Sequence, residues 1–373
     1  MNFRRKQDLA GAIEPRRILV VYGPRRVGKT TALEIYLRTQ PNKQTYYSTG
    51  DDIELREVFK SESRTKILDF ARPHEIIALD EAQYVPSIGL GAKMIIDAFP
   101  EKNVILTGSS SLSLSRQIGE PLTGRHFTLT LLPIAQSEIK GSRFELGSEL
   151  ESFLIYGSYP EVLNEPNKER KIKILAELVS SYLFKDALAL EAVRSPDVLL
   201  DVAKGLAFQV GREVSVNEIA RLAKTDSKTA ARYLDLLEKM FIVRRVRGYI
   251  RNLRNEISKK AKYYFLDNGI RNAIISQFNP LSLRDDIGAL WENFIFMELA
   301  KQSNLKGKFD NYYFWRTHVG QEIDIIKENN GILSAIECKW SRGDASPPKS
   351  WRTAYPEASF TVIHRENYLD LIL

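Results

Sequence analysis

Residues 18–30 are Ile18-Leu19-Val20-Val21-Tyr22-Gly23-Pro24-Arg25-Arg26-Val27-Gly28-Lys29-Thr30. An apolar run typical of a buried strand leads into the pattern G-x-x-x-x-G-K-[ST], and the helical pattern of residues 31–38 follows. Glycines let backbone N–H groups surround phosphate oxygens, the lysine neutralises phosphate charge, and the hydroxyl holds Mg²⁺ at the helix start. We therefore expect a nucleotide, ATP with Mg²⁺, to contact Gly23, Pro24, Arg25, Arg26, Val27, Gly28, Lys29, Thr30 and Thr31.

A second apolar run, residues 75–79, ends in two acidic residues, Asp80 and Glu81. A strand beside the phosphate loop would bring both carboxylates to the nucleotide. Asp80 is then expected to bind Mg²⁺ through water, and Glu81 to act as the base that polarises the attacking water. An acidic loop at a strand end is the alternative.

The apolar run 104–106 leads into a polar stretch in which Thr107 and Ser109 are candidates for contact with the γ-phosphate. Either residue could instead cap the following helix. Further along, Arg125 precedes the apolar run 127–131. It is a candidate arginine finger acting on a neighbouring subunit of a homo-oligomer, or else a surface arginine.

Length and composition set the broad class of the protein. The chain has 373 residues, 43% hydrophobic and 27% charged, which excludes a disordered chain and predicts more than one domain. Its single cysteine and scattered histidines exclude a disulfide framework and a zinc cluster. No run of about 18 uncharged apolar residues occurs, so we expect a cytoplasmic protein without a membrane partner. Apolar runs at 18–22, 45–47, 75–79, 103–107 and 127–131 predict an α/β fold with a parallel sheet.

The chain resembles the AAA-type ATPases of a widespread prokaryotic family whose C-terminal half is a domain of unknown function. The resemblance covers nearly the whole chain and implies an ATPase. Arg26 stands where that family more often has glutamine. The matching motifs are residues 23–30, Leu79-Asp80-Glu81-Ala82-Gln83, Leu106-Thr107-Gly108-Ser109-Ser110, Leu122-Thr123-Gly124-Arg125, Gly157-Ser158-Tyr159-Pro160 and Gly288-Ala289-Leu290-Trp291-Glu292-Asn293-Phe294.

Positive charge is concentrated between residues 211 and 262. This window holds 14 Lys and Arg against 6 Asp and Glu, while the rest of the chain has a net charge of −1. Clustered basic side chains bind phosphates by releasing counterions, so DNA is the expected partner, with a merely solvated face as the alternative.

The same window has the element order of a winged helix. Helical patterns at 216–223 and 227–240 flank a short turn, and two strand-like runs follow. In this interpretation Ala230, Ala231, Leu234 and Leu237 face inward. The expected DNA contacts are Lys228, Arg232, Arg244, Arg245, Arg247, Arg251 and Arg254, with Lys259, Lys260 and Lys262 in the same wing. Winged helices also dock proteins or serve as lids, which is the alternative.

Near the C-terminus, two strand-like runs carry acidic residues at a suggestive spacing. Asp324 and Glu337 lie 13 positions apart, and Asn329-Asn330-Gly331 is a hairpin signal between them. Strand alternation puts Glu337 and Lys339 on one face, and Cys338 with Ile336 and Trp340 on the other.

This D-x(12)-E-x-K pattern resembles the PD-(D/E)xK nuclease core, particularly that of archaeal Holliday-junction resolvases. The resemblance implies that Asp324, Glu337 and the Cys338 carbonyl hold Mg²⁺ and that Lys339 orients the water. Glu292, on the preceding helix, would contact the metal through water. Because E-x-K also occurs often on exposed sheet faces, a catalytically silent domain is the alternative.

Together these patterns predict four segments: a P-loop ATPase domain at 1–138, a helical lid or connector at 139–210, a winged helix at 211–270, and a nuclease-like α/β domain at 275–373. The expected function is ATP-controlled DNA processing by a Mg²⁺-dependent endonuclease acting on branched or duplex DNA, with ATP as the sole small-molecule substrate. An ATP-dependent DNA-binding regulator and a signalling ATPase with a protein partner are the alternatives.

Overall fold

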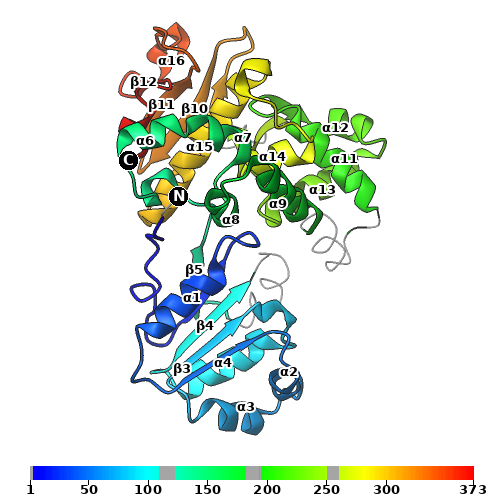
Figure 1. Ribbon diagram of the computed structural model, residues 1–373, viewed down its shortest axis with the longest axis vertical. Helices are drawn as coiled ribbons and strands as arrows, with labels where there is room; N and C mark the ends of the chain where they lie inside the picture. Colours follow the sequence, from blue (N-terminus) through cyan, green and yellow to red (C-terminus); the bar gives the residue numbers. More distant parts are fainter. Residues whose placement is uncertain (1–2, 109–121, 182–192, 194, 250–259) are drawn as a thin grey trace. The chain divides into compact units, whose positions relative to one another are not determined.

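A computed structural model of the chain describes residues 3–108, 122–181, 193, 195–249 and 260–373 (Figure 1). The chain forms two compact units. We call residues 5–132 the N-terminal unit, and residues 133–373 together with the first four residues the C-terminal unit.

The N-terminal unit is a parallel sheet with helices between its strands, in the strand order β2-β3-β4-β1-β5. Strands β1 and β3 are buried along their whole length, which explains their continuous apolar sequence. The five predicted strands are confirmed within two residues at each end. The elements are β1 (Ile18–Tyr22), α1 (Lys29–Arg38), β2 (Thr45–Thr49), α2 (Ile53–Lys60), α3 (Arg64–Ala71), β3 (Ile76–Asp80), η1 (Ala82–Tyr84), α4 (Ile88–Ala98), β4 (Asn103–Gly108) and β5 (His126–Thr130).

The C-terminal unit begins with helices and continues into a mixed sheet. Its first part contains η2 (Gln136–Glu138), α6 (Arg143–Ser148), α7 (Leu150–Tyr156), α8 (Pro160–Asn164), α9 (Lys168–Ser180) and α11 (Pro196–Ala207). The long helix expected over residues 168–193 is described as α9 as far as Ser180, and most of its remainder lies outside the described residues.

A helix-turn-helix and a strand pair follow. They consist of β6 (Glu213–Ser215), α12 (Val216–Leu222), α13 (Ser227–Lys239), β7 (Val243–Gly248) and β8 (Lys260–Phe265). Asp226 caps α13, its Oδ1 accepting the Thr229 N–H at 2.9 Å. This capped turn explains why the second helix begins where the sequence pattern predicts.

The last part of the chain extends the same sheet. It contains α14 (Asn268–Ile274), η5 (Leu281–Leu283), α15 (Ile287–Leu305), β9 (Asn311–Arg316), β10 (Glu322–Asn329), β11 (Ile332–Cys338), α16 (Lys349–Ala354), β12 (Ser359–Ile363) and α17 (Tyr368–Ile372). The strand order is β12-β11-β10-β9-β7-β8-β6, and helix α15 contacts β8 and β11.

One pairing distinguishes this architecture from the separate domains expected from the sequence. Strand β7 pairs in parallel with β9, with Arg247 opposite Tyr313 and Gly248 opposite Phe314. A sheet runs through residues from both the expected winged helix and the expected nuclease-like domain, and all of residues 133–373 form one compact unit.

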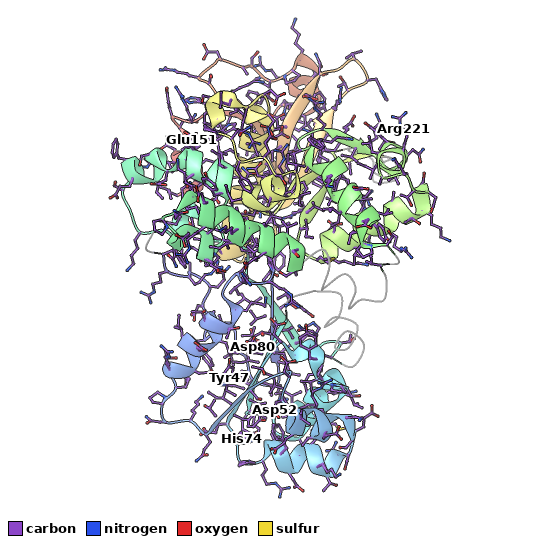
Figure 2. The ribbon with its side chains drawn as sticks, turned by 45° about the vertical axis from the view of Figure 1, so that its right-hand side comes forward. Tyr47, Asp52, His74, Asp80, Glu151 and Arg221 are labelled. Atoms are coloured by element: carbon purple, nitrogen blue, oxygen red, sulfur yellow. The ribbon has the colours of Figure 1, made fainter. Side chains whose placement is uncertain are left out.

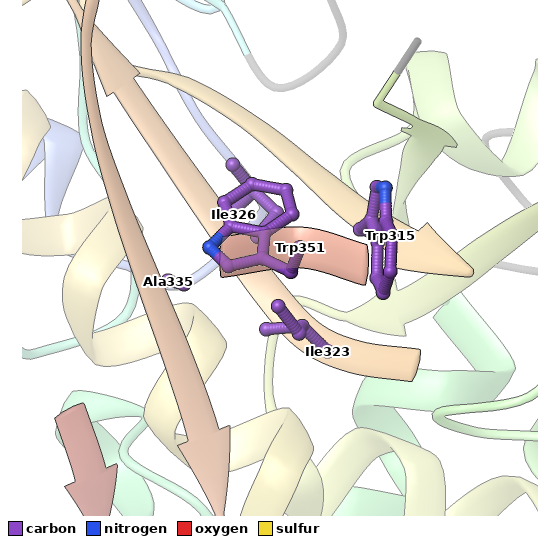
Figure 3. Close-up of a cluster of buried hydrophobic side chains, with 5 residues drawn as sticks. All are labelled: Trp315, Ile323, Ile326, Ala335 and Trp351. Carbon is purple, nitrogen blue, oxygen red and sulfur yellow. The ribbon is translucent and has the colours of Figure 1, made fainter. Parts of the chain in front are cut away.

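An apolar cluster covers one face of the last strands. Trp351 of α16 packs on Trp315, Ile323, Ile326 and Ala335 (Figure 3). Ile323 and Ile326 are three positions apart, so strict alternation would point them to opposite faces. The register between β9 and β10 shifts between these two residues, and this bulge brings both side chains to the same cluster. No helix in the described parts of the chain is long and apolar enough to cross a membrane.

Candidate functional site

The phosphate loop has the strand-loop-helix setting that its sequence predicts. Gly23 has a φ of 152°, and a Cβ there would lie 2.1 Å from the Leu131 carbonyl oxygen, so a larger residue does not fit. Gly28 is left-handed at a φ of 93° and immediately precedes α1. The loop folds around Lys29, whose Nζ donates to the carbonyl oxygens of Gly23 at 3.0 Å and Pro24 at 2.9 Å.

Hydrogen bonds connect the loop to the acidic end of β3. Thr30 Oγ1 donates to Asp80 Oδ2 at 2.5 Å. Thr107 Oγ1 donates to the other carboxylate oxygen, Asp80 Oδ1, and accepts the Glu81 N–H at 3.1 Å. The side-chain amide of Gln83 donates to Glu81 Oε2. These contacts form because β4 lies between β1 and β3, which puts Thr107 beside both β-strand ends.

This arrangement fits a nucleotide with Mg²⁺. The Thr30 hydroxyl and the Asp80 carboxylate are hard oxygen donors that already converge on one another. Asp80 and His74 lie near the two ends of β3 (Figure 2). The phosphate loop comes after β1, so it lies at the same edge of the parallel sheet as Asp80. Glu81, the next residue, has a left-handed φ of 51° that turns the chain sharply at this edge.

Arg125 and Ser109 do not join this group. Arg125 precedes β5, and its carbonyl oxygen accepts the Ile18 N–H at 2.9 Å, at the edge of the sheet opposite the phosphate loop. Its Nε forms a half-exposed ion pair with Asp97 at 2.8 Å. It therefore has no access to the phosphate loop of its own chain. Ser109 lies outside the described residues.

Both ends of the N-terminal unit contact the phosphate loop or its strand. The Arg5 guanidinium donates to the Val27 carbonyl oxygen. At the other end, the Leu131 N–H donates to the Tyr22 carbonyl oxygen at 2.8 Å. The two points at which the chain leaves this unit thus lie beside residues of the nucleotide site, a feature that the sequence did not reveal.

The expected DNA contacts differ in exposure. Lys228 and Arg232 on α13, and Arg245 and Arg247 on β7, are exposed, as is Arg221 at the surface of α12 (Figure 2). Arg251 and Arg254 lie outside the described residues, as does Lys259.

Two side chains within the basic segment 211–262, Arg244 and Ala231, differ in exposure from the sequence prediction. The Arg244 guanidinium packs on the rings of Tyr312 at 5.3 Å and Phe296 at 5.8 Å, and burial lowers its pKa. Because β7 lies next to β9, residues of α15 and β9 cover this side chain. Ala231 is exposed, and Tyr233 is buried in its place beside Ala230, Leu234 and Leu237, as the helical period of 3.6 requires.

Glu292 and Asp324 meet at an unexpected partner, Lys262 of β8. Lys262 Nζ lies 3.0 Å from Glu292 Oε1 and 4.0 Å from Asp324 Oδ1. The sequence analysis placed Lys262 in the wing with the DNA-contacting residues, but its side chain is buried. Its position in the otherwise apolar run Ala261 to Phe265 could have predicted this burial.

Burial dominates the electrostatics of this group. It raises the pKa of Glu292 to about 7 despite the opposing charge of Lys262. Burial also raises the pKa of Asp324, and with the neighbouring carboxylates it raises the pKa of the Cys338 thiol well above its usual value. Burial alone would lower the pKa of Lys262, but the negative charges of Glu292 and Asp324 outweigh this effect and raise the pKa.

The rest of the expected nuclease set has separate contacts. Glu337 accepts a hydrogen bond from Lys339 Nζ at 2.7 Å, and burial and the charge of Asp324 raise the pKa of Glu337. Asp324 Oδ2 accepts the backbone N–H of Cys338 at 2.8 Å. Trp340, which follows the end of β11, contacts Trp291 of α15.

A divalent cation does not fit the carboxylates of Glu292 and Asp324 as they stand. The ammonium of Lys262 already occupies the space between them at hydrogen-bonding distance from Glu292. Within the described ranges, no group of three or more His, Cys, Asp or Glu side chains is placed to hold a metal ion.

Three family models match successive parts of the chain. Residues 15–140 match an AAA domain. Residues 147–281 and 287–368 match two domains of unknown function, DUF8612 and DUF4143 respectively.

Two uncharacterized proteins are similar to this chain over most of its length. An uncharacterized protein of Haemophilus influenzae is 26% identical over 83% of this chain and 79% of its own length. An uncharacterized protein of Methanocaldococcus jannaschii is 24% identical over 88% of this chain and 76% of its own. The match to a solved structure of Drosophila ORC bound to DNA covers 72% of this chain and 92% of that one, at 11% identity and a TM-score of 0.24. The family matches and the geometry of the phosphate loop together support an AAA-type ATPase domain followed by C-terminal domains of unknown function.

Proposed function

We propose that this protein is an ATP-hydrolysing switch in which the nucleotide bound to the N-terminal unit controls DNA binding by the C-terminal unit. The observation that carries the proposal is the hydrogen-bond network that joins Thr30, Asp80, Thr107 and Glu81. A structural role alone would not require a buried carboxylate to be connected to both the phosphate loop and a second acid.

The network assigns a role to each side chain in hydrolysis. Lys29 neutralises phosphate charge, and Thr30 with Asp80 would hold Mg²⁺, which withdraws charge from the phosphate oxygens. Glu81 accepts the proton of the attacking water. Thr107 fixes the Glu81 backbone through its N–H, and Gln83 orients the Glu81 carboxylate.

The ends of the N-terminal unit support control of the remainder of the chain. Arg5 and Leu131 are the first and nearly the last residues of that unit, and both contact the phosphate loop or its strand. A change of the loop on binding or losing the γ-phosphate would therefore reach the two connections to the C-terminal unit. Such coupling needs a difference in DNA affinity between nucleotide states.

Exposed basic side chains support DNA as the ligand of the C-terminal unit. Lys228 and Arg232 lie on the second helix of the helix-turn-helix, and Arg245 and Arg247 on the adjoining strand. The order of helix, helix and strand pair supports a winged helix. Side chains of this kind contact phosphates and give affinity with little sequence selectivity. Arg125 remains a candidate arginine finger across a subunit boundary of a homo-oligomer.

Metal-dependent DNA cleavage is the second candidate. The pairing of Lys339 with Glu337, close enough to Asp324 for their charges to interact, favours it. The position of Lys262 between the other carboxylates disfavours it.

Two assays separate these functions. Wild-type protein and Lys29→Ala are compared for ATP hydrolysis, which Lys29→Ala should abolish. Wild type and Asp324→Ala are then incubated with labelled duplex, single-stranded and four-way-junction DNA in Mg²⁺ or Mn²⁺, with and without ATP. The switch predicts salt-sensitive binding without cleavage, whereas cleavage that disappears in Asp324→Ala would establish the nuclease instead. Hydrolysis that survives in Lys29→Ala would refute the ATPase assignment.

A further inference from the structure

Lys262 has a rigid position in the sheet. It is central in β8, opposite Val246 of β7 on one side and Glu213 of β6 on the other. Its side chain is only 4% exposed. Both neighbouring strands hold the backbone of Lys262, and its side chain lies almost fully covered beside the sheet.

The ammonium is enclosed by two carboxylates and an aromatic ring. It lies 3.0 Å from Glu292 Oε1 on α15, 4.0 Å from Asp324 Oδ1 on β10, and 5.6 Å from the centre of the Phe314 ring. The two carboxylates are themselves nearly covered, with side chains 12% and 11% exposed. Buried charges require partners, and here each partner is on a different element.

The other atoms around the carboxylates leave little room for another cation. The Tyr264 hydroxyl donates to Glu292 Oε1 at 2.6 Å, and the Cys338 N–H donates to Asp324 Oδ2 at 2.8 Å. A Cβ on Gly211 would lie 2.8 Å from Glu292 Oε2. Mg²⁺ binds oxygens at about 2.1 Å and usually keeps several waters, which this space does not accommodate beside an ammonium.

We infer that Lys262 is a built-in cation that takes the position of a metal ion between Glu292 and Asp324. Its single positive charge offsets part of the negative charge of the two carboxylates, excludes divalent cations from them, and links α15 and β10 to β8. A second positive charge at this distance would be repelled by the ammonium. The site is thereby a structural junction in the wild-type chain.

The inference predicts that removing the ammonium creates a metal site. Mn²⁺ binding is measured by electron paramagnetic resonance on the full chain without nucleotide, with Asp80→Asn present in every sample to remove the acid of the ATPase site. Lys262→Met should gain about one bound Mn²⁺ per chain, and adding Asp324→Asn should abolish the gain. Lys262→Arg, which keeps the charge, is the matched control and should gain none.

The parent protein provides a test that does not depend on the folding of Lys262→Met. The inference requires that the Asp80→Asn parent and its Asp324→Asn derivative bind Mn²⁺ equally. A parent that binds one more Mn²⁺ than its Asp324→Asn derivative would overturn it, as would a folded Lys262→Met protein that gains no Mn²⁺.

Discussion

Replacing Thr107 by valine removes one hydroxyl from the nucleotide site and preserves the shape of the side chain. Thr107 is fully buried, and its hydroxyl donates to Asp80 and accepts the Glu81 N–H at 3.1 Å. A hydrogen bond to a charged group contributes about 1.5–3 kcal/mol, and a buried donor left without a partner costs about 1–3 kcal/mol. Because the two effects share one hydroxyl, we expect the free energy of unfolding of the N-terminal unit to fall by about 3 kcal/mol.

The same change should slow hydrolysis, since Glu81 loses the anchor of its backbone. We expect kcat to fall about tenfold, equivalent to about 1.4 kcal/mol, with the KM for ATP little changed because the phosphate loop is untouched. Urea denaturation and steady-state ATP hydrolysis measure the two effects. Thr107→Ser is the control: it keeps the hydroxyl, loses one methyl group, and should cost about 1 kcal/mol in stability. Equal stability and equal kcat for the valine and serine variants would refute the role of the hydroxyl.

Three further predictions concern the base, the buried acid and the basic surface. Glu81→Gln should retain ATP binding, measured by a fluorescent analogue, while kcat falls by about 10²–10⁴ because the base is lost; unchanged turnover would exclude Glu81 as the base. Burial raises the pKa of Glu292 to about 7, so the folded state binds a proton at this carboxylate more tightly than the unfolded state does. The free energy of unfolding therefore falls as pH rises from about 4.5 to about 7. The melting temperature of wild type relative to Glu292→Gln should decline over that range, and a constant difference would contradict the raised pKa. Lys228→Ala with Arg232→Ala should reduce the slope of log K against log salt for duplex DNA by about two, whereas Arg244→Ala should lower stability and leave that slope unchanged.

The sequence predicted that the residues of the candidate nucleotide site lie together because they follow strand ends at fixed positions. Apolar runs before Gly23, Asp80 and Thr107 were sufficient, since parallel strands bring their carboxyl ends to the same edge. The same logic could not predict that Thr107 bridges Asp80 and Glu81, because the order of strands across the sheet is a tertiary property. Nor could it predict the pairing of Arg125 with Asp97.

The C-terminal unit was less predictable because pairing between strands far apart in the sequence decides which of its side chains are buried. Residues 211–262 carry an obvious positive charge, but the pairing of β7 with β9 covers Arg244, and Lys262 is buried against Glu292. A charge count does not distinguish these two from exposed neighbours such as Arg245. The bulge at Asp324 likewise depends on the register with β9 and has no signature in the local sequence.

Control of DNA affinity by the bound nucleotide is tested most directly by fluorescence anisotropy of a labelled duplex with Glu81→Gln protein, at one salt concentration, in saturating ATP and in saturating ADP. We expect dissociation constants that differ at least fivefold, a coupling of about 1 kcal/mol, and no difference in a Glu81→Gln protein that also carries Lys29→Ala. Equal affinities in ATP and ADP, with both nucleotides bound, would contradict it.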